Sequence, residues 1–524
     1  MSILPRYALP DRESARNINV ETKPRQVEAW LGRLPLSNPL EAAEELSDYL
    51  ATLNAIEVSH DTRAKIVERL APVAEEIVAS LYEQYGNAPL PLQPKSHRNA
   101  MLAQKLLRGM ADAYKVLLVD WLRRRFHLFG GNPAPVYLQR ILLALQAVLE
   151  ISFEIHDPVP EGVWVDLHQT YNYALRSGLK DVIPEGAAKM LAPEQIYKSS
   201  LLMALADPYR LPQVEIPWAR DIIARFSNLV GLNPAEESVQ ARSGLFLVDV
   251  NTDSPPKPVT REAHPTNPRW DLLLNTAELV KHLALIATQI KGREDLDKLG
   301  LPEAARDPAY PAMLHRLKQN LGASLQRQSQ RRRHQDGRDV EVCFGLKSVH
   351  HLIAPPSRGD TIHYGLAGNE PPPVVLRCKT LNDSMGGLSL GKRGTQGMQI
   401  RVGDAVGTRQ GGPSWSVGLV RWFRSPAEGE VSFGVQLLSP QVQAIQLRRP
   451  DNGRQWPCLL LHPSPAGPQG MLLMAQPGCF LPEGPVEMRA PKGTLEVYIG
   501  KRIEATPSIE IFRFQPEVPA PTSG

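Results

Sequence analysis

The sequence has little cysteine: four residues in 524, all of them after residue 300. No two are spaced as CxxC, so the pattern provides neither a disulfide framework nor a zinc site. A long apolar run is also missing. The most apolar stretch, 141–153, is too short to span a bilayer and contains Gln146 and Glu150. We therefore expect a protein of the reducing cytoplasm that is not an integral membrane protein and holds no metal.

The sequence also lacks a surplus of charge. Its 59 lysines and arginines face 55 aspartates and glutamates, a net charge of +4. A chain that coats nucleic acid or an anionic membrane is usually far more basic. We therefore expect no DNA or RNA partner, and any anion-binding site must be local.

Glycine is scarce in the first part of the chain, where residues 1–300 contain 12 of the 38 glycines. The shorter remainder contains 26 glycines, and the 48 prolines divide equally between the two parts. The length alone predicts about three domains. The uneven glycine content further indicates that a helical part precedes a part rich in turns.

Apolar residues in the stretch 97–127 recur at steps of three and four, which predicts an amphipathic helix. They are Leu102, Leu106, Met110, Ala113, Leu117 and Trp121. Helical patterns also cover 39–54, 60–84, 135–154, 164–177, 193–206, 214–229 and 269–291. We predict a flexible N-terminus at 1–24 and an all-α domain at 25–325, an irregular bundle with a strand or loop insertion near 243–263. This domain has no nucleophile, metal or phosphate-loop pattern, so we expect no catalytic residue and no enzyme.

The most basic segment of the chain is a predicted hinge at 326–338. Its arginines, opposed only by Asp336, are Arg327, Arg331, Arg332, Arg333 and Arg338. Guanidinium groups form charge-assisted hydrogen bonds with phosphates and pair with O6 and N7 of guanine. A binding site for a phosphorylated ligand is one interpretation of this segment, and a generic basic linker is the other.

After the hinge, short apolar or alternating runs separated by turn residues predict a small antiparallel β-barrel at 339–450. The run NDSMGG fits the pattern [D/N]xSxxG with Asn382, Ser384 and Gly387. A VGD turn follows at 402–404, and then the strands GLVRWF and FGVQLL. With arginines before the first strand and these elements in this order, the chain resembles the PilZ family of bacterial cyclic di-GMP receptors over about 327–447.

The resemblance implies a cyclic di-GMP site made by the hinge arginines with Asn382, Ser384 and Gly387. Asn382 and Ser384 would offer polar groups to a guanine edge or a phosphate. Gly387 would allow close backbone approach or a positive φ. An ordinary β-turn is the alternative interpretation of NDSMGG.

The arginine motif of the family, RxxxR, leaves two possible pairs. Arg327 and Arg331 fit its spacing literally but lie further from the first strand. Arg333 and Arg338 fit it with one additional residue. In the strand that follows, alternation sends Trp422 and Phe423 to opposite faces, which predicts one barrel-core residue and one interface residue rather than a base-stacking site.

Beyond the predicted barrel, residues 451–515 remain β-like and either extend it or form a second small barrel. A disordered tail is expected at 516–524. The predicted fold class is therefore multidomain α + β, an all-α domain followed by a PilZ-like antiparallel β-barrel and further β structure. The predicted function is a cyclic di-GMP receptor whose helical domain contacts a protein partner. The alternative is a ligand-free adaptor or scaffold for motility, pili or surface machinery.

Overall fold

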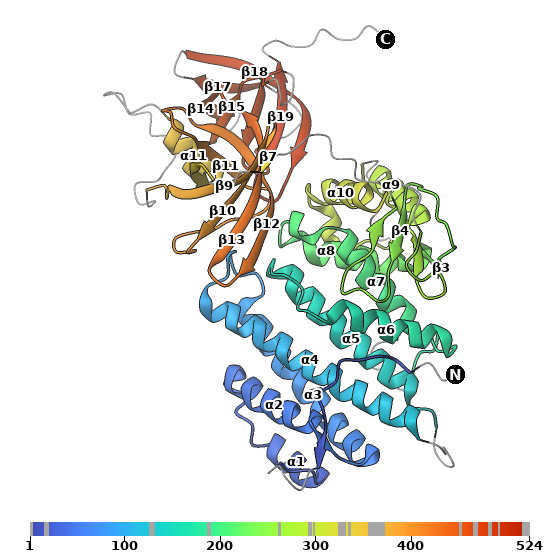
Figure 1. The fold of residues 1–524 in the computed structure, drawn as a ribbon. Helices are drawn as coiled ribbons and strands as arrows, with labels where there is room; N and C mark the ends of the chain where they lie inside the picture. The colour runs from blue at the N-terminus through green and yellow to red at the C-terminus, as the bar shows by residue number, and fades with distance from the viewer. Residues whose placement is uncertain are drawn as a thin grey trace.

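The computed structural model describes residues 4–14, 20–124, 131–185, 190–259, 264–291, 296, 299–322, 332–333, 337–354, 372–449, 453–464, 470–479, 485–490 and 493–515. Figure 1 shows the helices stacked in one elongated body and two strand-rich units beside one end of it. Arg327, Arg331 and the predicted tail at 516–524 lie outside the described residues.

The helical body confirms the predicted class of the N-terminal half. Its helices are α1 (Pro24–Leu31), α2 (Pro39–Asn54), α3 (His60–Tyr85), α4 (Pro94–Arg123), α5 (Ala134–Glu154), α6 (Val163–Arg176), α7 (Pro193–Leu205) and α8 (Glu215–Phe226). The long helix α4 packs against α2, α3 and α5. Its apolar stripe, with Leu106 and Leu117 buried, lies in one continuous core because steps of three and four residues keep these side chains on one face.

Helix α5 is, within the described residues, the only one long and apolar enough to cross a membrane by length and composition. Most of its apolar surface is buried against α4, α6 and α7. Burial of this kind also occurs in the core helices of helical bundles, so the apolar composition of α5 is explained by its packing.

The N-terminal segment differs from the flexible segment predicted for 1–24. Tyr7 shares a hydrogen bond of 3.0 Å with the hydroxyl of Thr170. Arg12 forms two hydrogen bonds with the carboxylate of Asp120, at 2.8 and 2.9 Å. Strand β1 (Glu13–Ser14) pairs with β2 (Ile56–Glu57). These contacts join residues far apart in sequence, which a local pattern does not reveal.

A four-stranded antiparallel sheet follows α8, in the order β3-β6-β4-β5. Its strands are β3 (Gly231–Pro234), β4 (Leu245–Val248), β5 (Lys257–Pro258) and β6 (Leu272–Asn275), and helices α9 (Ala277–Lys291) and α10 (Tyr310–Gly322) follow it. The predicted helix at 269–291 is wrong over its first residues, which form β6. The strand ends at Asn275, whose side chain accepts a hydrogen bond from Ala277 N at 3.1 Å and so caps α9.

The first barrel is closed by six antiparallel strands in the order β9-β10-β13-β12-β11-β8, with β8 pairing back to β9. The strands are β8 (Asp339–Phe344), β9 (Leu376–Ser384), β10 (Gly387–Arg393), β11 (Ala405–Arg409), β12 (Ser416–Ala427) and β13 (Glu430–Ser439). Phe423 and Phe433 are fully buried in its core. The short strand β7 (Arg332–Arg333) adds to the edge of β9.

The remaining strands form a second closed barrel, which decides between the two alternatives left open for the C-terminal segment. Its order is β14-β15-β16-β19-β18-β17. The strands are β14 (Val442–Arg448), β15 (Gln455–Leu461), β16 (Leu472–Ala475), β17 (Pro485–Ala490), β18 (Gly493–Ala505) and β19 (Glu510–Gln515). Strand β14 pairs only within this barrel, although the predicted boundary fell after it, at 451.

Helix α11 (Leu346–Ile353) joins the two barrels and was not predicted. Leu346 and Val349 lie in an apolar cluster with Leu419 of the first barrel and Leu459 of the second. His350 Nε2 is 2.9 Å from the carbonyl oxygen of Ile445. The barrels therefore share a core at their contact.

Candidate functional site

The run NDSMGG forms the hairpin between β9 and β10. Ser384 and Gly387 are the closing pair, so Met385 and Gly386 make a two-residue turn. The φ of Gly387 is not in the left-handed region. A Cβ there would instead lie 2.7 Å from the carbonyl oxygen of Val435. Of the two roles predicted for Gly387, the structure shows close backbone approach.

Two rows of cross-strand neighbours extend from this hairpin over the outer face of the barrel. In one row, Asn382 pairs with Ser389, Ser389 with Gly434, and Gly434 with Trp422. The other row is made by Ser384, Gly387, Gln436 and Leu419. The row between them contains Leu388, Val420 and Val435, which point into the core. Because faces alternate along a strand, Asn382 and Ser384 point outward over a floor of small residues.

The indole of Trp422 lies over Gly434. A Cβ at Gly434 would overlap the Nε1 and Cδ1 atoms of this ring. Trp422 is half-buried, whereas its neighbour Phe423 is fully buried. The predicted opposite orientation of these two aromatic side chains is therefore confirmed, and the outer one borders the row that begins at Asn382. We call the patch formed by Asn382, Ser384, Gly387 and Trp422, together with the buried Ser389 and Gly434 beneath it, the outer trough.

The described arginines of the predicted hinge lie at the β9 edge of the outer trough. Arg332 pairs with Asp383 and Arg333 with Asn382 along the backbone. Asp339 of β8 pairs with Lys379 of the same strand. Arg333 and Asp339 thus pair with residues of the same strand, β9, that are only three positions apart. Arg333 and Asp339 are themselves six positions apart, so the chain between β7 and β8 has three more residues than the strand it pairs with.

Arg338 reaches the same hairpin with its side chain. Its Nη2 lies 3.1 Å from Oδ2 of Asp383, and the Arg338 side chain is 64% exposed, so the guanidinium remains accessible to solvent. Asp383 itself lies on the inward row with Leu388. The structure thus brings Arg332, Arg333 and Arg338 to the strand that carries Asn382 and Ser384.

The VGD turn holds the second barrel rather than joining the trough. Gly403 has a φ of 90°, and its carbonyl oxygen accepts a hydrogen bond of 3.0 Å from Thr506 Oγ1. Burial raises the pKa of the Asp404 carboxyl, which is hydrogen-bonded to Ser508. This sequence motif therefore has a structural role between the barrels.

Arg421 is a residue that sequence reasoning missed. It occupies a bulge in β12, between the paired residues Val420 and Trp422. Its Nε donates to Oε1 of Gln436 at 2.6 Å, and its two terminal nitrogens bind the carboxylate of Glu504 in the second barrel. A bulge re-aims a side chain without a clear sequence pattern, so this placement could not be predicted.

The far end of β12 contacts the helical body through His156. The backbone oxygen of His156 accepts from Ser425 N at 3.0 Å. Its Nδ1 is 3.2 Å from the carbonyl oxygen of Phe423, and because a carbonyl only accepts, this nitrogen carries the proton. Burial lowers the pKa of His156 to about 4, so the imidazole is neutral near pH 7. The guanidinium of Arg424 lies 4.5 Å from the ring centre of Tyr209, which adds a cation–π contact.

A second contact with the helical body comes from the loop between α3 and α4. Leu90 is 1% exposed and belongs to the core of the first barrel. Its carbonyl oxygen accepts a hydrogen bond of 2.8 Å from Ile400 N. The helical body therefore supplies a side chain to the barrel interior.

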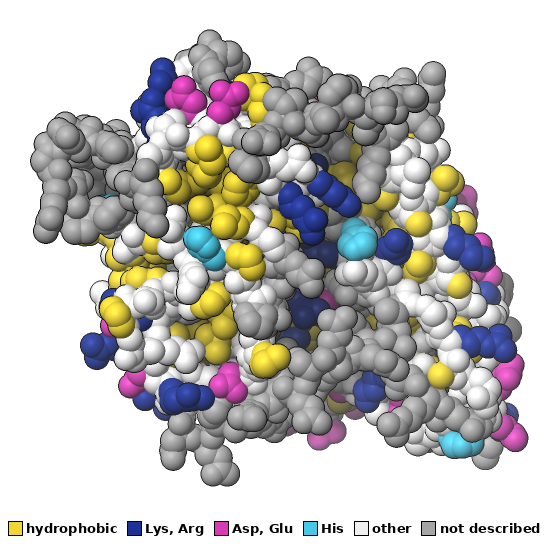
Figure 2. All heavy atoms as spheres, turned by 90° about the horizontal axis from the view of Figure 1, so that it is seen from above, with side chains coloured by type: hydrophobic (Ala, Val, Ile, Leu, Met, Phe, Trp, Pro, Cys, Tyr) yellow, Lys and Arg dark blue, Asp and Glu magenta, His cyan; other side chains and the backbone are white. Residues whose placement is uncertain are grey.

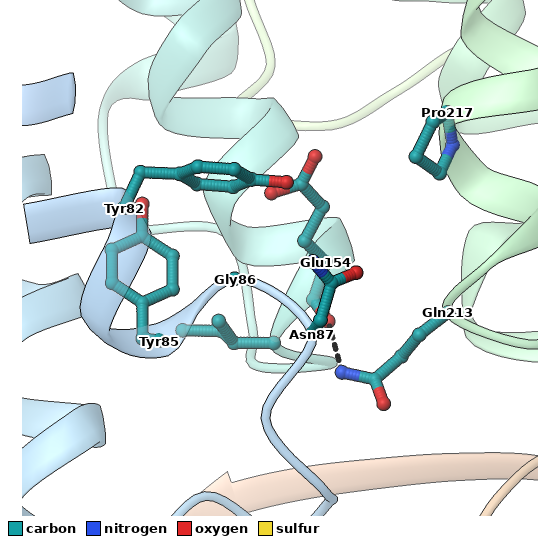
Figure 3. A pocket seen from close by; sticks show the side chains of 8 residues that line it. Tyr82, Tyr85, Gly86, Asn87, Glu154, Gln213 and Pro217 are labelled. Carbon is teal, nitrogen blue, oxygen red and sulfur yellow. Dashed lines mark hydrogen bonds between the residues drawn. The ribbon is translucent and has the colours of Figure 1, made fainter.

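A small cleft lies between this loop, the end of α5 and the start of α8. Figure 3 shows the Tyr82 hydroxyl directed toward the carboxylate of Glu154, with Gln213 on the opposite side. Gln213 donates to the backbone oxygen of Glu154 at 3.2 Å. Burial raises the pKa of Glu154 to about 7. The cleft contains none of the predicted site residues.

One face of the molecule has a group of basic side chains, and further charged side chains are scattered along its edges (Figure 2). Seen from above, lysine and arginine side chains form a small group near the middle of the face, and apolar side chains gather to one side (Figure 2). In the described part of the chain, no group of three or more His, Cys, Asp or Glu side chains is placed to hold a metal ion.

Two family models match the chain. One, described as the N-terminal domain of the cyclic-di-GMP receptor FimW, matches residues 25–236. The other, described as its middle PilZ domain, matches residues 245–358 and 361–444. The second match identifies a PilZ domain in this chain, and the curated relative described next is a receptor. The match to the PilZ model begins well before residue 327, so it includes β4 to β6, α9 and α10.

One curated relative has both of these domains. The chain is 23% identical over 497 residues to the cyclic-di-GMP receptor FimW of Pseudomonas aeruginosa, an alignment covering 82% of this chain and 79% of that one. No solved structure matches the chain.

Proposed function

We propose that the chain is a cyclic di-GMP receptor and that the outer trough is its binding surface. The observation that carries the proposal is the placement of Asn382 and Ser384 beside the backbone of Arg332 and Arg333, with the Arg338 guanidinium at the same hairpin. The relative that the chain matches over most of its length is named as a receptor for this ligand.

The chemistry of the trough suits the ligand. Cyclic di-GMP has two phosphates, for which arginine offers charge-assisted hydrogen bonds, and two guanines. Gly387 has no side chain above the strand, so a flat purine can approach the backbone there, whereas the indole of Trp422 covers Gly434. For the outer aromatic residue the sequence predicted an interface rather than base stacking. We propose instead that the half-buried indole of Trp422 offers a stacking surface, a contact worth about 1–3 kcal/mol per base.

Between the two arginine pairs left open by the sequence, the strand register favours Arg333 and Arg338. Both flank the additional residues between β7 and β8, and both lie on the edge of β9. Additional residues between the two arginines of such a motif change their spacing in sequence while both arginines stay beside β9.

We further propose that ligand binding acts on the helical body, which binds a protein partner in the cytoplasm. Strand β12 supports this route because Trp422 borders the trough and the next three residues contact the barrel core, Tyr209 and His156 in turn. A ligand that orders the arginine segment on β9 would bias the position of this strand.

Calorimetry with cyclic di-GMP tests the proposal. The full chain is expected to bind at micromolar ligand or below, and Trp422→Ala should weaken binding by roughly tenfold or more, as expected for loss of one stacking contact. Gly434→Ala should do the same, since a methyl group there displaces the indole.

Two substitutions on the same barrel serve as controls. Trp415→Ala removes an indole that lies under Arg409, and Gly412→Ala adds a methyl group where the nearest atom is 4.0 Å away. Both variants should bind as the wild type does. Failure of the wild-type chain to bind would reject the receptor and favour the ligand-free adaptor.

A further inference from the structure

The second barrel reaches the edge of the outer trough through one ion pair. Glu504 of β18 binds Arg421 of β12 with both carboxylate oxygens, and the contact between Nη2 and Oε2 is 2.8 Å. The side chains of Arg421 and Glu504 are 30% and 21% exposed, so the pair is accessible from solvent. Glu504 lies outside the segment that matches the PilZ model, which ends at residue 444.

Arg421 lies at the side of the trough opposite the other arginines. Its Nε bond to Gln436 places it next to Gly387, because Gln436 and Gly387 are cross-strand neighbours. The arginines of β7 lie beyond β9, whereas Arg421 lies beyond β13 on β12. A ligand in the trough would therefore have arginine on both sides.

The hydrogen bonds of Arg421 indicate what kind of group it can bind. A guanidinium has five N–H donors, and three of these are used by Gln436 and Glu504. One N–H therefore remains on each terminal nitrogen, and because these two N–H groups lie on different edges of the planar guanidinium, an acceptor atom meets only one of them. Because Glu504 already balances the positive charge, a neutral acceptor suits these donors better than a second anion does. The O6 and N7 atoms of guanine are such acceptors.

We propose that Arg421, held in position by Glu504 of the second barrel, donates one N–H to O6 of a guanine in the trough and determines the specificity for that base. The second barrel is then a part of the ligand site. This inference rests on the proposed function, since it assigns a base contact within the same site.

The first test compares cyclic di-GMP with cyclic di-AMP by calorimetry. Adenine has an amino donor where guanine has O6, so it does not accept from Arg421 at that position. Arg421→Ala should lower the ratio of the two affinities roughly tenfold, the size of one base-specific contact. Arg409→Ala is the matched control: Arg409 binds Glu341 at 2.6 Å on the same barrel, and its loss should leave the ratio unchanged.

The second test separates recognition from support of the fold. In Arg421→Glu/Glu504→Arg the ion pair is re-formed with its charges exchanged, so thermal stability should return toward the wild-type value. The affinity ratio should stay low, because the arginine now extends from the other barrel. Recovery of the ratio in this double variant would show that the pair only joins the barrels and would overturn the inference.

The two proposals fail in different ways. A wild-type chain that binds no cyclic di-GMP rejects both. Binding by the wild type with an unchanged affinity ratio in Arg421→Ala rejects only the role of Arg421, and the receptor function stands.

Discussion

The two barrels have the same number of strands and the same closed antiparallel architecture, yet they place glycine differently. In the first barrel, a Cβ at Gly387 or Gly434 would collide with the neighbouring backbone or with an indole. Turn glycines with a positive φ and open space around them occur in both barrels, for example Gly394 and Gly429 in the first and Gly470 and Gly478 in the second. At Gly387 and Gly434 the first barrel has no side chain on its outer face, which leaves room for the proposed ligand or for the indole of Trp422. Under the proposed function, one architecture provides the main ligand surface in the first barrel and positions one side chain of that surface from the second.

The largest expected effect tests whether the barrels are independent. Leu459 is fully buried in the apolar cluster shared with the first barrel, and Leu459→Ala should lower the free energy of unfolding by about 2–5 kcal/mol. Hydrogen exchange should then lose protection in β12 as well as in β15.

The matched variant for this experiment is Leu473→Ala. Leu473 is equally buried but belongs to a cluster formed by the second barrel alone. Its loss of protection should be confined to that barrel. If both variants lower protection in the same strands equally, the shared core does not couple the two barrels.

An intermediate effect concerns the contact between the first barrel and the helical body. The pKa of His156 is lowered by burial to about 4, below its ordinary value of about 6.5. Between these values the unfolded chain binds a proton that the folded chain does not. The contribution of neutral His156 to the free energy of unfolding is therefore fully present above pH 6.5. It falls by about 3 kcal/mol as the pH approaches 4.

Urea unfolding of the wild type and His156→Gln over this pH range measures the effect. Glutamine can still donate to the carbonyl of Phe423 but does not titrate, so the variant should lose less stability on acidification. The buried His168, whose pKa is also lowered to about 4, remains in both proteins. Parallel pH profiles for the two proteins would contradict the prediction.

The smallest expected effect concerns the charge at the trough. Asp383→Asn removes the partner of a largely exposed guanidinium, Arg338, so stability should change by less than about 1 kcal/mol. Affinity for cyclic di-GMP should rise a few-fold, because a phosphate that binds Arg338 no longer has to displace the carboxylate of Asp383. Glu430→Gln is the control: it removes the carboxylate paired with Arg393 at 2.8 Å, outside the trough, and should leave affinity unchanged.

Much of the helical half could be predicted because the residues that define each helix lie close together in the sequence. The apolar steps in α4 and the prolines that begin α2 and α5 lie within the helices they define. Strand β6 was missed since LLLN fits a helix or a strand equally well, and only its pairing with β3 and β4 decides.

The candidate site could be predicted in part for the same reason. NDSMGG is a local motif, so Asn382, Ser384 and Gly387 were found from the sequence. The floor made by Ser389 and Gly434 depends on the register of three strands. A one-residue change of register would turn these side chains to the other face, which no spacing along the chain reveals.

The insertion of Leu90 into the first barrel limits how the parts of this protein can be separated. A barrel cut from the chain after the helices would keep a vacancy where a leucine stood, and the apolar lining around it would face water. Grafting this barrel onto another protein therefore requires the loop between α3 and α4 to travel with it. The sensing unit is discontinuous in sequence, and its first part precedes its strands by about 250 residues.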